Sequence, residues 1–311
     1  MNKVALIIPY FGKWPEWMDL YLFSCSKQHN IDFVFYTDCV IPVRIYKNTI
    51  FHQISFEDYC AFVSKRLLIP FHPKAAYKLC DLKVFYGIVH ENDLQGYEWW
   101  GFGDIDLVYG ELSLLVNEDN LQKYDLLTTH VDRIAGHFTI IRKDSKYTDL
   151  CKEIPDWKKL LCDAENHGID ENAFTRKAMS FKYKMVGKLY YYIMRRITSP
   201  NSKHYWYSKL ETLIRLLPSR ILMKEFFTTF KPKPGQVCTY NPLTSTLSCP
   251  TNQISRMQFG GGIYLHFMCF KKTPYYITDN YWKDGFYQIP SGYDFSKGGV
   301  VEISTDSIRL K

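Results

Sequence analysis

The first 110 residues alternate between short, continuously apolar runs and longer segments whose apolar positions have helical spacing. An apolar run without polar alternation is typical of a strand buried on both faces, as in a parallel sheet. The expected strands cover residues 4–8, 32–38, 43–46, 50–54 and 97–103, and the expected helices cover 16–28, 57–68 and 74–90. This alternation predicts an α/β fold in which helices flank a doubly wound, mostly parallel sheet. Such sheets bind ligands at the carboxyl ends of their strands.

The size and composition are those of an ordinary globular protein. The 311 residues are 46% hydrophobic and 23% charged, which provides for a hydrophobic core and excludes a disordered or fibrous chain. Nine cysteines occur without any Cys-x-x-Cys pair, so we expect buried free thiols. A zinc site at Cys238 and Cys249 is disfavoured for the same reason, because structural zinc sites usually contain such closely spaced ligands.

Two features of the sequence bear on where the protein acts. The first 12 residues contain one basic residue and an apolar run broken by Pro9, without the small-residue cleavage site of a signal peptide. No uninterrupted apolar stretch approaches the roughly 20 residues that span a bilayer. We therefore expect a cytoplasmic protein.

The formal net charge of +7 is concentrated in one segment. Residues 176–233 contain 14 Lys and Arg but only two acids, a net charge of +12, which leaves the rest of the chain slightly acidic. Their interleaved aromatic and aliphatic residues predict basic amphipathic helices. One interpretation is a solvated helical appendage; the other is a surface within 182–233 that binds anionic lipid, peripheral at the inner face of the cytoplasmic membrane. We expect a catalytic domain of residues 1–175 plus 251–311, with 176–250 as a basic helical insertion.

The strongest chemical signal is the pair Asp104 and Asp106, which directly follows the expected strand 97–103. Two carboxylates two residues apart can reach one hard cation where the chain kinks, and the glycines before them would permit a kink. We therefore expect these aspartates to hold Mn²⁺ or Mg²⁺, which would bridge a diphosphate and neutralise a leaving group. The alternative is that this Asp-x-Asp lies in a solvated loop or a helix cap.

A third metal ligand is expected far downstream, at His266. An apolar strand carries His266 toward a turn, and Lys271 and Lys272 follow within six residues. The histidine would complete the metal shell, and the lysines would grip phosphate oxygens. The alternative for a lone histidine on an apolar strand is a hydrogen-bonded core residue.

These motifs resemble those of GT-A fold glycosyltransferases, whose sheet is Rossmann-like. The resemblance rests on the first strand, Thr37-Asp38 at the end of the second, Asp104-Ile-Asp106, and His266-Phe followed by Lys-Lys-x-Pro. The His-Phe pattern is similar to that of the glycogenin and lipopolysaccharide-galactosyltransferase type. It departs from that type because Met268-Cys-Phe stands where a glycine usually lies. The resemblance covers residues 1–175 and 255–280.

Three residues ahead of the Asp-x-Asp extend the resemblance. The placement of Lys74, Asp81 and Lys83 is similar to that in bacterial capsule and O-antigen (lipopolysaccharide) sugar transferases. Lys74, Lys78 and Lys83 are also spaced for one face of a helix. That spacing predicts either a lysine near the diphosphate or a solvated helix face.

The resemblance implies a nucleotide site at the carboxyl ends of the first strands. The loop Pro9, Tyr10 and Phe11, together with Asp38, would hold the base and the ribose, with one aromatic ring stacked on uracil. Each of these residues also fits a core aromatic or a helix N-cap. The cofactor-binding residues implied in this way are Pro9, Tyr10, Phe11, Asp38, Lys74, Asp81, Lys83, Asp104, Lys271 and Lys272.

An inverting transferase would need a general base for the acceptor hydroxyl. The candidates are Asp170 and Glu171, just before a helical stretch, and Asp132. The resemblance places an acidic residue of this kind beside the acceptor, which favours Asp170 or Glu171. Asp170 also fits a helix N-cap, and a retaining enzyme would need no such base. Residues 136–138 would line the acceptor side or form a tight turn into a strand at 138–142.

Three classes of function follow from these signals. The leading hypothesis is a metal-dependent hexosyltransferase that moves a sugar from a UDP-sugar, such as UDP-galactofuranose or UDP-galactose, to a lipid-linked glycan of a bacterial capsule or O-antigen. A nucleic-acid-binding protein would explain the basic, aromatic segment but would leave Asp104, Asp106 and His266 without a role, so no nucleic acid partner is expected. A metal-dependent phosphodiesterase would usually need more acids and histidines around two metals.

Overall fold

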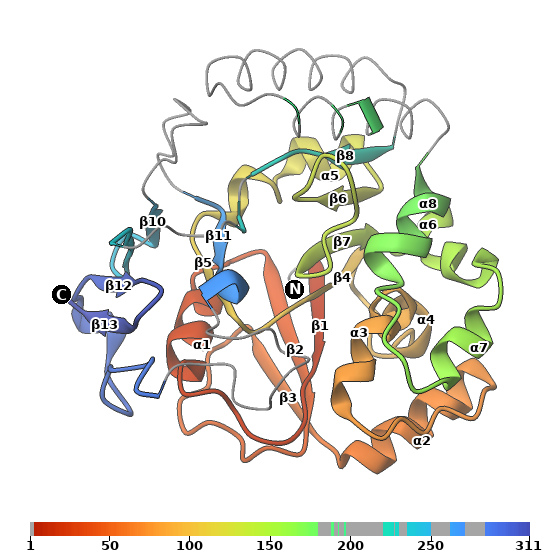
Figure 1. Cartoon of the computed structure of the whole chain (residues 1–311), viewed down its shortest axis with the longest axis horizontal. Coiled ribbons are helices and arrows are strands. Elements are labelled where there is room, and N and C mark those ends of the chain that lie inside the picture. The colour runs from red at the N-terminus through yellow and green to blue at the C-terminus, as the bar shows by residue number, and fades with distance from the viewer. Residues whose placement is uncertain are drawn as a thin grey trace.

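A seven-stranded sheet forms the centre of the molecule (Figure 1). The structure is a computed structural model that describes residues 3–179, 188–189, 192, 196, 220–226, 228–229, 235–249, 262–270 and 284–311. The strands of this sheet are β1 (Val4–Pro9), β2 (Ile31–Thr37), β3 (Thr49–Gln53), β4 (Trp99–Gly103), β6 (Leu126–Thr128), β7 (Phe138–Arg142) and β8 (Ile221–Met223). Their spatial order is β3-β2-β1-β4-β7-β6-β8.

Most neighbouring strands of this sheet are parallel. Strand β1 pairs in parallel with β2 and β4, β2 with β3, and β6 with β8. Among the described strands of the sheet, only β7 runs antiparallel to its neighbours, β4 and β6. The predicted α/β fold with a mostly parallel sheet is therefore confirmed, and the carboxyl ends of β1, β2 and β4 meet at one edge.

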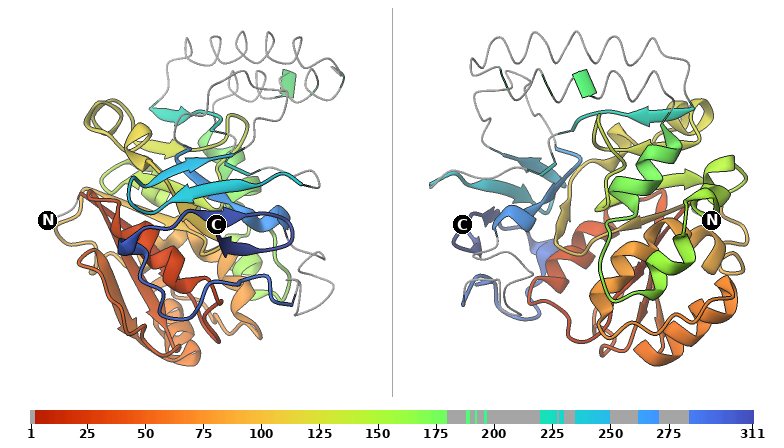
Figure 2. Two further views of the ribbon diagram at one scale, coloured as in Figure 1. Left: turned by 90° about the vertical axis from the view of Figure 1, so that its left-hand side faces the viewer. Right: turned by 45° about the vertical axis from the view of Figure 1, so that its right-hand side comes forward.

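Helices cover both faces of the sheet (Figures 1 and 2). The α-helices are α1 (Met18–Ser26), α2 (Phe56–Leu67), α3 (Leu79–Leu82), α4 (Tyr86–Val89), α5 (Glu118–Lys123), α6 (Lys146–Asp149), α7 (Trp157–Cys162) and α8 (Thr175–Ala178). Short 3-10 turns are η1 (Ala76–Lys78), η2 (Lys83–Phe85), η3 (Leu112–Leu114), η4 (Leu150–Glu153), η6 (Phe267–Phe270) and η7 (Phe295–Lys297), and η5 (Asp170–Phe174) is a π-helix.

The apolar run of β1 supplies a hydrophobic core on each face of the sheet. Val4, Leu6 and Ile8 pack with α1 and the C-terminal strands, whereas Ala5 and Ile7 pack with α2–α4 and α6–α8. Successive side chains of a strand point to opposite faces. When both faces are covered, every side chain of the strand is buried, so every position is apolar. The continuous apolar pattern of β1 is therefore explained by burial on both faces of the sheet, as predicted.

Two predicted elements are wrong. Residues 43–46 form no strand, because they belong to an extended connection from β2 to β3 in which Val43 is fully exposed. The helix predicted over 74–90 is broken into η1, α3, η2 and α4, so its lysines do not share one face. By contrast, α2 lies within one residue of the predicted bounds 57–68, and Ser55 caps its first turn by accepting a hydrogen bond from the Asp58 backbone N–H.

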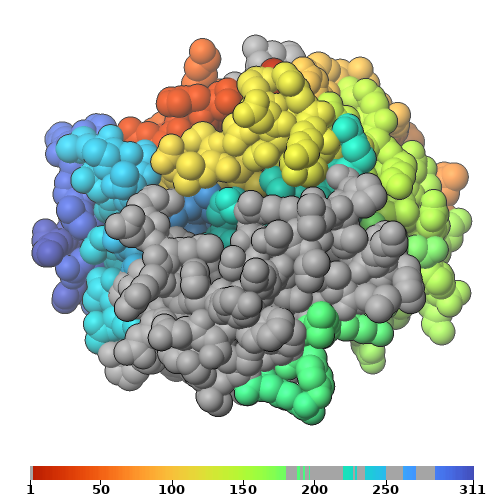
Figure 3. All heavy atoms as spheres, turned by 90° about the horizontal axis from the view of Figure 1, so that it is seen from above, coloured from red at the N-terminus to blue at the C-terminus, as the bar shows by residue number. Residues whose placement is uncertain are grey.

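Two smaller sheets complete the described structure. The first has the order β10-β9-β12-β13, and the second pairs β11 with β5. Their strands are β5 (Leu107–Tyr109), β9 (Cys238–Asn241), β10 (Thr246–Ser248), β11 (Tyr264–His266), β12 (Val301–Ile303) and β13 (Ile308–Leu310). Figure 3 shows one face of the molecule, with these C-terminal strands (blue) at one end and residues near α7 and α8 (green) at the other.

The predicted boundaries of the basic insertion do not match the sheets. Residues 221–223 add strand β8 to the central sheet, residues 238–241 pair with the C-terminal β12, and residues 246–248 pair with 239–241. These parts of 176–250 therefore belong to the body of the protein. Most of 182–219, where the basic amphipathic helices are expected, lies outside the described residues.

Two further expectations concern membranes and cysteines. No helix in the described ranges is long and apolar enough to cross a membrane. None of the nine cysteines forms a disulfide, and five of them are buried, which agrees with the expectation of free thiols. Cys238 and Cys249 do lie side by side on β9 and after β10, where the neighbouring thiol, and then burial, raise the pKa of Cys238. Two thiols alone do not make up the four ligands of a structural zinc site.

Candidate functional site

The predicted metal ligands Asp104, Asp106 and His266 lie together. Each offers one ligand atom, and these atoms are all within 4.8 Å of one another. The Asp106 Oδ1 atom is 3.3 Å from His266 Nε2, and both side chains are largely buried. Among the residues that the structure describes, this is the one group of three or more acids, histidines or cysteines that could hold a metal ion.

Strand pairing explains why ligands 160 residues apart meet. Asp104 follows β4 directly, and its backbone N–H donates to the carbonyl of His137 at the start of β7. Strand β5 then begins at Leu107, opposite His266 on β11. The chain turn between β4 and β5 therefore carries both aspartates, and the β5–β11 pair brings the histidine to it.

The glycines before the aspartates serve packing rather than a kink. A Cβ atom at Gly101 would lie 2.4 Å from the Thr139 carbonyl oxygen of β7, closer than real contacts allow. Neither Gly101 nor Gly103 has a positive φ, so the turn at Asp104 does not depend on a left-handed glycine. These glycines let neighbouring elements approach the strand that ends at the metal ligands.

Lys83 connects the metal ligands to the turn before β7. Its ammonium donates to Asp104 Oδ1 at 2.5 Å and to the Gly136 carbonyl at 2.9 Å. Burial opposes its charge, but the attraction of Asp104 and further nearby acidic groups outweighs this and raises the pKa of Lys83 well above its usual value. Lys83 is therefore a permanent buried cation beside the candidate metal ligands.

Asp170 is a buried carboxyl group on the other side of Gly136. A Cβ atom at Gly136 would lie only 2.5 Å from Asp170 Oδ2, so glycine is required there for close approach. Burial, only partly opposed by Lys83, raises the pKa of Asp170 to about 7. The N-cap interpretation is wrong: Asp170 opens the π-helix η5, and its carboxylate accepts from the next residue's N–H, that of Glu171.

The other two candidate bases are joined by a cation. Arg133 contacts Asp132 at 3.1 Å and Glu171 at 3.5 Å. Glu171 also accepts a long hydrogen bond, 3.4 Å, from the Gly136 backbone N–H. The structure thus brings Asp132, Glu171 and Asp170 into one acidic group around residues 133–136, with Asp170 the buried member.

The predicted nucleotide loop is ordered by a contact between β1 and β2. Asp38, at the end of β2, accepts a 2.7 Å hydrogen bond from the Gly12 backbone N–H, where the chain has a φ of +106°. Tyr10 stacks on Trp14 with ring centroids 5.1 Å apart. Phe11, by contrast, is buried against Phe56 and Tyr59, so the core interpretation holds for it. Only Tyr10 of the two aromatics stands where it could stack on a base.

Of the remaining predicted donor residues, the structure describes Asp81 and Lys74. Asp81 is fully buried and accepts hydrogen bonds from the backbone N–H groups of His167 and Ile169, so we assign it a structural role. Lys74 is exposed. Lys271 and Lys272 lie outside the described residues.

A stack of histidines behind the metal ligands was not expected from the sequence. His137, predicted to line the acceptor side, instead stacks on His266 with centroids 4.3 Å apart, and His130 packs edge-on against His137 at 5.0 Å. Burial, and then the neighbouring His266, lower the pKa of His137 well below its usual value, so it is a neutral ring. Thr228 and Thr229 contact these rings, and no sequence signal marked them, because they precede His266 by 37 residues or more.

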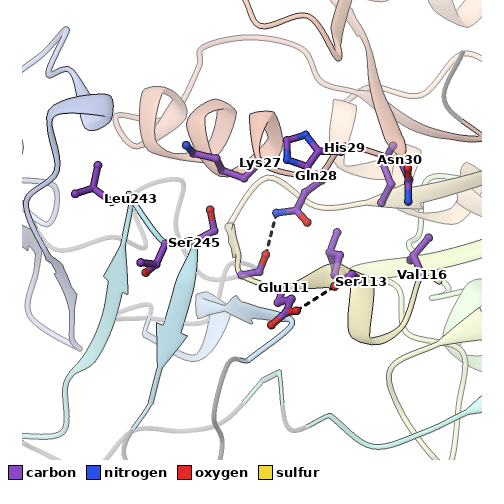
Figure 4. Close-up of a pocket in the computed structure, with 13 residues that line it drawn as sticks. Lys27, Gln28, His29, Asn30, Glu111, Ser113, Val116, Leu243 and Ser245 are labelled. Atoms are coloured by element: carbon purple, nitrogen blue, oxygen red, sulfur yellow. Dashed lines mark hydrogen bonds between the residues drawn. The ribbon is translucent and has the colours of Figure 1, made fainter.

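A cavity lies elsewhere in the described structure (Figure 4). It has a volume of about 480 Å³ and lies between the end of α1, the turn after β5 and the β9–β10 hairpin. The side chain of Gln28 in its wall is already bound to the Gly110 carbonyl, and that of Glu111 is bound to Ser113. Because the cavity includes the residues before β2, it lies at the opposite edge of the sheet from Asp104, and we do not assign chemistry to it.

Comparison with known protein families gives one match. Residues 6–279 match the model of a family described as "Family of unknown function (DUF6625)". The chain belongs to this family. The matched region contains all three candidate metal ligands, together with Lys83 and Asp170. Comparison with curated proteins finds no match.

Proposed function

We propose that this member of the DUF6625 family is a metal-dependent GT-A-type glycosyltransferase. The observation that carries the proposal is the grouping of Asp104, Asp106 and His266 beside Lys83, at the carboxyl edge of a mostly parallel sheet. Open α/β sheets bind their ligands at this edge. The donor would be a nucleotide sugar, with UDP-galactose or UDP-galactofuranose as first choices.

The ligand set fits Mn²⁺ or Mg²⁺. Two carboxylates and one imidazole suit a hard to borderline divalent cation. Metal–ligand distances of about 2.1 Å put ligand atoms at most ~4.2 Å apart, so small side-chain rotations would close the observed 4.8 Å spread. When bound, the ion would bridge the donor diphosphate and neutralise the leaving nucleotide.

Each neighbouring residue has a role in this proposal. Lys83 fixes Asp104 and the Gly136 carbonyl, and its charge favours an anionic donor. Tyr10 and Asp38 hold the base and ribose. Asp170, with a pKa near 7, is suited to hold or accept a proton at neutral pH, and we propose it as the general base if the enzyme inverts.

The acceptor in this proposal is a lipid-linked glycan of bacterial capsule or O-antigen synthesis. The supporting feature is the charge of residues 176–233, which contain 14 Lys and Arg and only two acids. Such a segment would attract anionic lipid at about 1 kcal/mol per cation near the surface. The protein would then act peripherally at the inner face of the cytoplasmic membrane.

Binding of UDP and transfer from UDP-sugars, each with and without Mn²⁺, test the proposal. Asp106→Asn should abolish metal-dependent UDP binding and lower transfer at least 100-fold, because a metal ligand is lost. Asp119→Asn, an exposed aspartate on α5, is the matched control and should behave as the wild type. Presenting the acceptor in anionic and in neutral vesicles tests the membrane role.

Three outcomes would contradict parts of this proposal. Unaltered UDP binding by the Asp106→Asn variant would exclude the metal centre. Metal-dependent cleavage of phosphodiesters without sugar transfer would favour the alternative of a phosphodiesterase. Equal transfer in the two kinds of vesicle would exclude a role for anionic lipid.

A further inference from the structure

His266 is held on two sides by consecutive threonines and a second histidine. Its Nδ1 atom is 2.9 Å from Thr229 Oγ1, and its backbone N–H donates to the Thr228 carbonyl at 2.8 Å. One ring face lies on His137, whose Nε2 is 3.3 Å from Thr228 Oγ1. Each of the two stacked rings thus has its own threonine hydroxyl.

These contacts decide which nitrogen faces Asp106. With Nδ1 directed at Thr229, the other nitrogen, Nε2, is the one that lies 3.3 Å from Asp106 Oδ1. A histidine that binds a metal through Nε2 must be neutral, with its proton on Nδ1. That N–H needs an acceptor, because His266 is 3% exposed and an unpaired buried donor is costly.

The Thr229 hydroxyl can satisfy His266 both with and without a metal. A hydroxyl both donates and accepts, so it can donate to a bare Nδ1 or accept from a protonated one. Replacing Thr229 by an apolar residue would leave the protonated Nδ1 without an acceptor, which penalises the metal-binding tautomer specifically.

We propose that Thr229 is a positioning residue for the metal ligand His266, and that Thr228 supports it indirectly by holding His137. This inference rests on the metal centre proposed above. It makes the segment after β8 part of the site, because this segment leaves the central sheet at Met223 and reaches His266 six residues later. Thr228 and Thr229, two residues of the predicted insertion, thereby lie beside the candidate metal centre.

Thr229→Val tests the proposal, because it keeps the branched shape and the backbone pairing while removing the hydroxyl. Mn²⁺ affinity, measured by electron paramagnetic resonance titration without donor, should fall about 10–100-fold, the usual effect of removing a partner of a metal-binding histidine. Thr229→Ser should restore affinity. Thr228→Val should have a smaller effect, since His266 keeps its own hydroxyl partner.

A second measurement reports the tautomer itself. In the wild type with Mg²⁺, ¹⁵N chemical shifts should show His266 protonated on Nδ1, and the Thr229→Val variant should need more Mg²⁺ to reach that state. Equal Mn²⁺ affinities of wild type and Thr229→Val would overturn the positioning role. His266→Ala separates the two failures: if it also binds Mn²⁺ normally, the metal centre itself is absent.

Discussion

Two buried lysines five residues apart have different surroundings. Lys78 and Lys83 both lie in the broken helical segment, both are at most 8% exposed, and both pair with an aspartate. In the sequence they look alike, as members of one helix face. The structure separates them. Lys78 joins Asp81 to the loop around Asp163, whereas Lys83 contacts the candidate metal ligand Asp104.

Lys78 is the centre of a closed structural cluster. Its ammonium pairs with Asp81 at 3.1 Å and Asp163 at 3.0 Å, and it donates to the backbone carbonyls of Leu160 and Glu165. Asp81 in turn accepts from two backbone N–H groups of the loop before η5. This cluster therefore fastens α3 to that loop.

Lys83 has fewer partners, and one of them is a candidate metal ligand. It holds Asp104 Oδ1 and the Gly136 carbonyl, and the Asp104 side chain is still 32% exposed. A charge pair that remains open on one side can accept a further ligand, such as a cation or a phosphate. Asp163, a partner of Lys78, is equally exposed, but it is bonded to His167, whereas Asp104 lies beside two further candidate metal ligands. The comparison teaches that the groups around the partner carboxylate, rather than the burial of the lysine, distinguish a candidate functional pair from a structural one.

The largest effect on stability is expected from Lys78→Met. Removing the cation leaves the fully buried Asp81 carboxylate without its counter-charge, which typically costs 3–5 kcal/mol, so we expect a loss of about that size in the free energy of unfolding. Denaturant unfolding measures it. Lys74→Met, an exposed lysine nearby, is the control and should change stability by less than ~0.5 kcal/mol.

Lys78→Met should not affect ligand binding. The folded fraction of Lys78→Met should bind Mn²⁺ and UDP as the wild type does, because none of its partners is a metal ligand. Loss of metal binding at unchanged stability would reverse the assignment of the two lysines.

Lys83→Met should reduce the transfer rate more than the stability, the opposite of Lys78→Met. The exposed side of Asp104 can be hydrated, so the free energy of unfolding should fall by only about 1–3 kcal/mol. The transfer rate should fall about 10–100-fold, because a metal ligand loses the group that orients it. Steady-state kinetics on the folded variant, beside its unfolding curve, make the measurement; a stability loss as large as that of Lys78→Met with normal kinetics would contradict it.

The sequence predicted the elements and the grouping of Asp104, Asp106 and His266 better than their surroundings. Continuous apolar runs located the strands of the doubly wound part, and Asp104, Asp106 and His266 stood out because few residue types bind hard cations. The roles of Lys78 and Asp81 could not be predicted, since they depend on the loop 163–169, about 85 residues later. Thr229 was missed for the same reason, because a threonine gains a role only from what the fold sets opposite it.

Asp170→Asn should change stability least of the three variants. It sharpens the comparison of structural and candidate functional charges, because stability and activity should change in opposite directions. Burial raises the pKa of Asp170 to about 7, whereas an unfolded aspartate titrates near 4. The folded state therefore holds this proton more tightly, so the free energy of unfolding is highest below about pH 4. It falls as pH rises from about 4 to about 7, by up to ~1.4 kcal/mol per pH unit, and is constant above. The uncharged asparagine should remove this dependence.

At pH 8 the Asp170→Asn variant should be more stable than the wild type by about 1–2 kcal/mol. The pKa of about 7 corresponds to ~4 kcal/mol at ~1.4 kcal/mol per pKa unit, and burial of the new amide NH₂ group without an assigned acceptor offsets about 1–3 kcal/mol of this gain. If Asp170 is the base, the same variant should lose 10²–10⁴-fold in transfer rate, about the contribution of general base catalysis. Lys78→Met would then lose stability and keep activity, while Asp170→Asn would gain stability and lose activity. Parallel pH–stability curves for wild type and Asp170→Asn would instead show that Asp170 titrates normally, and would move the search for the base to Glu171 and Asp132.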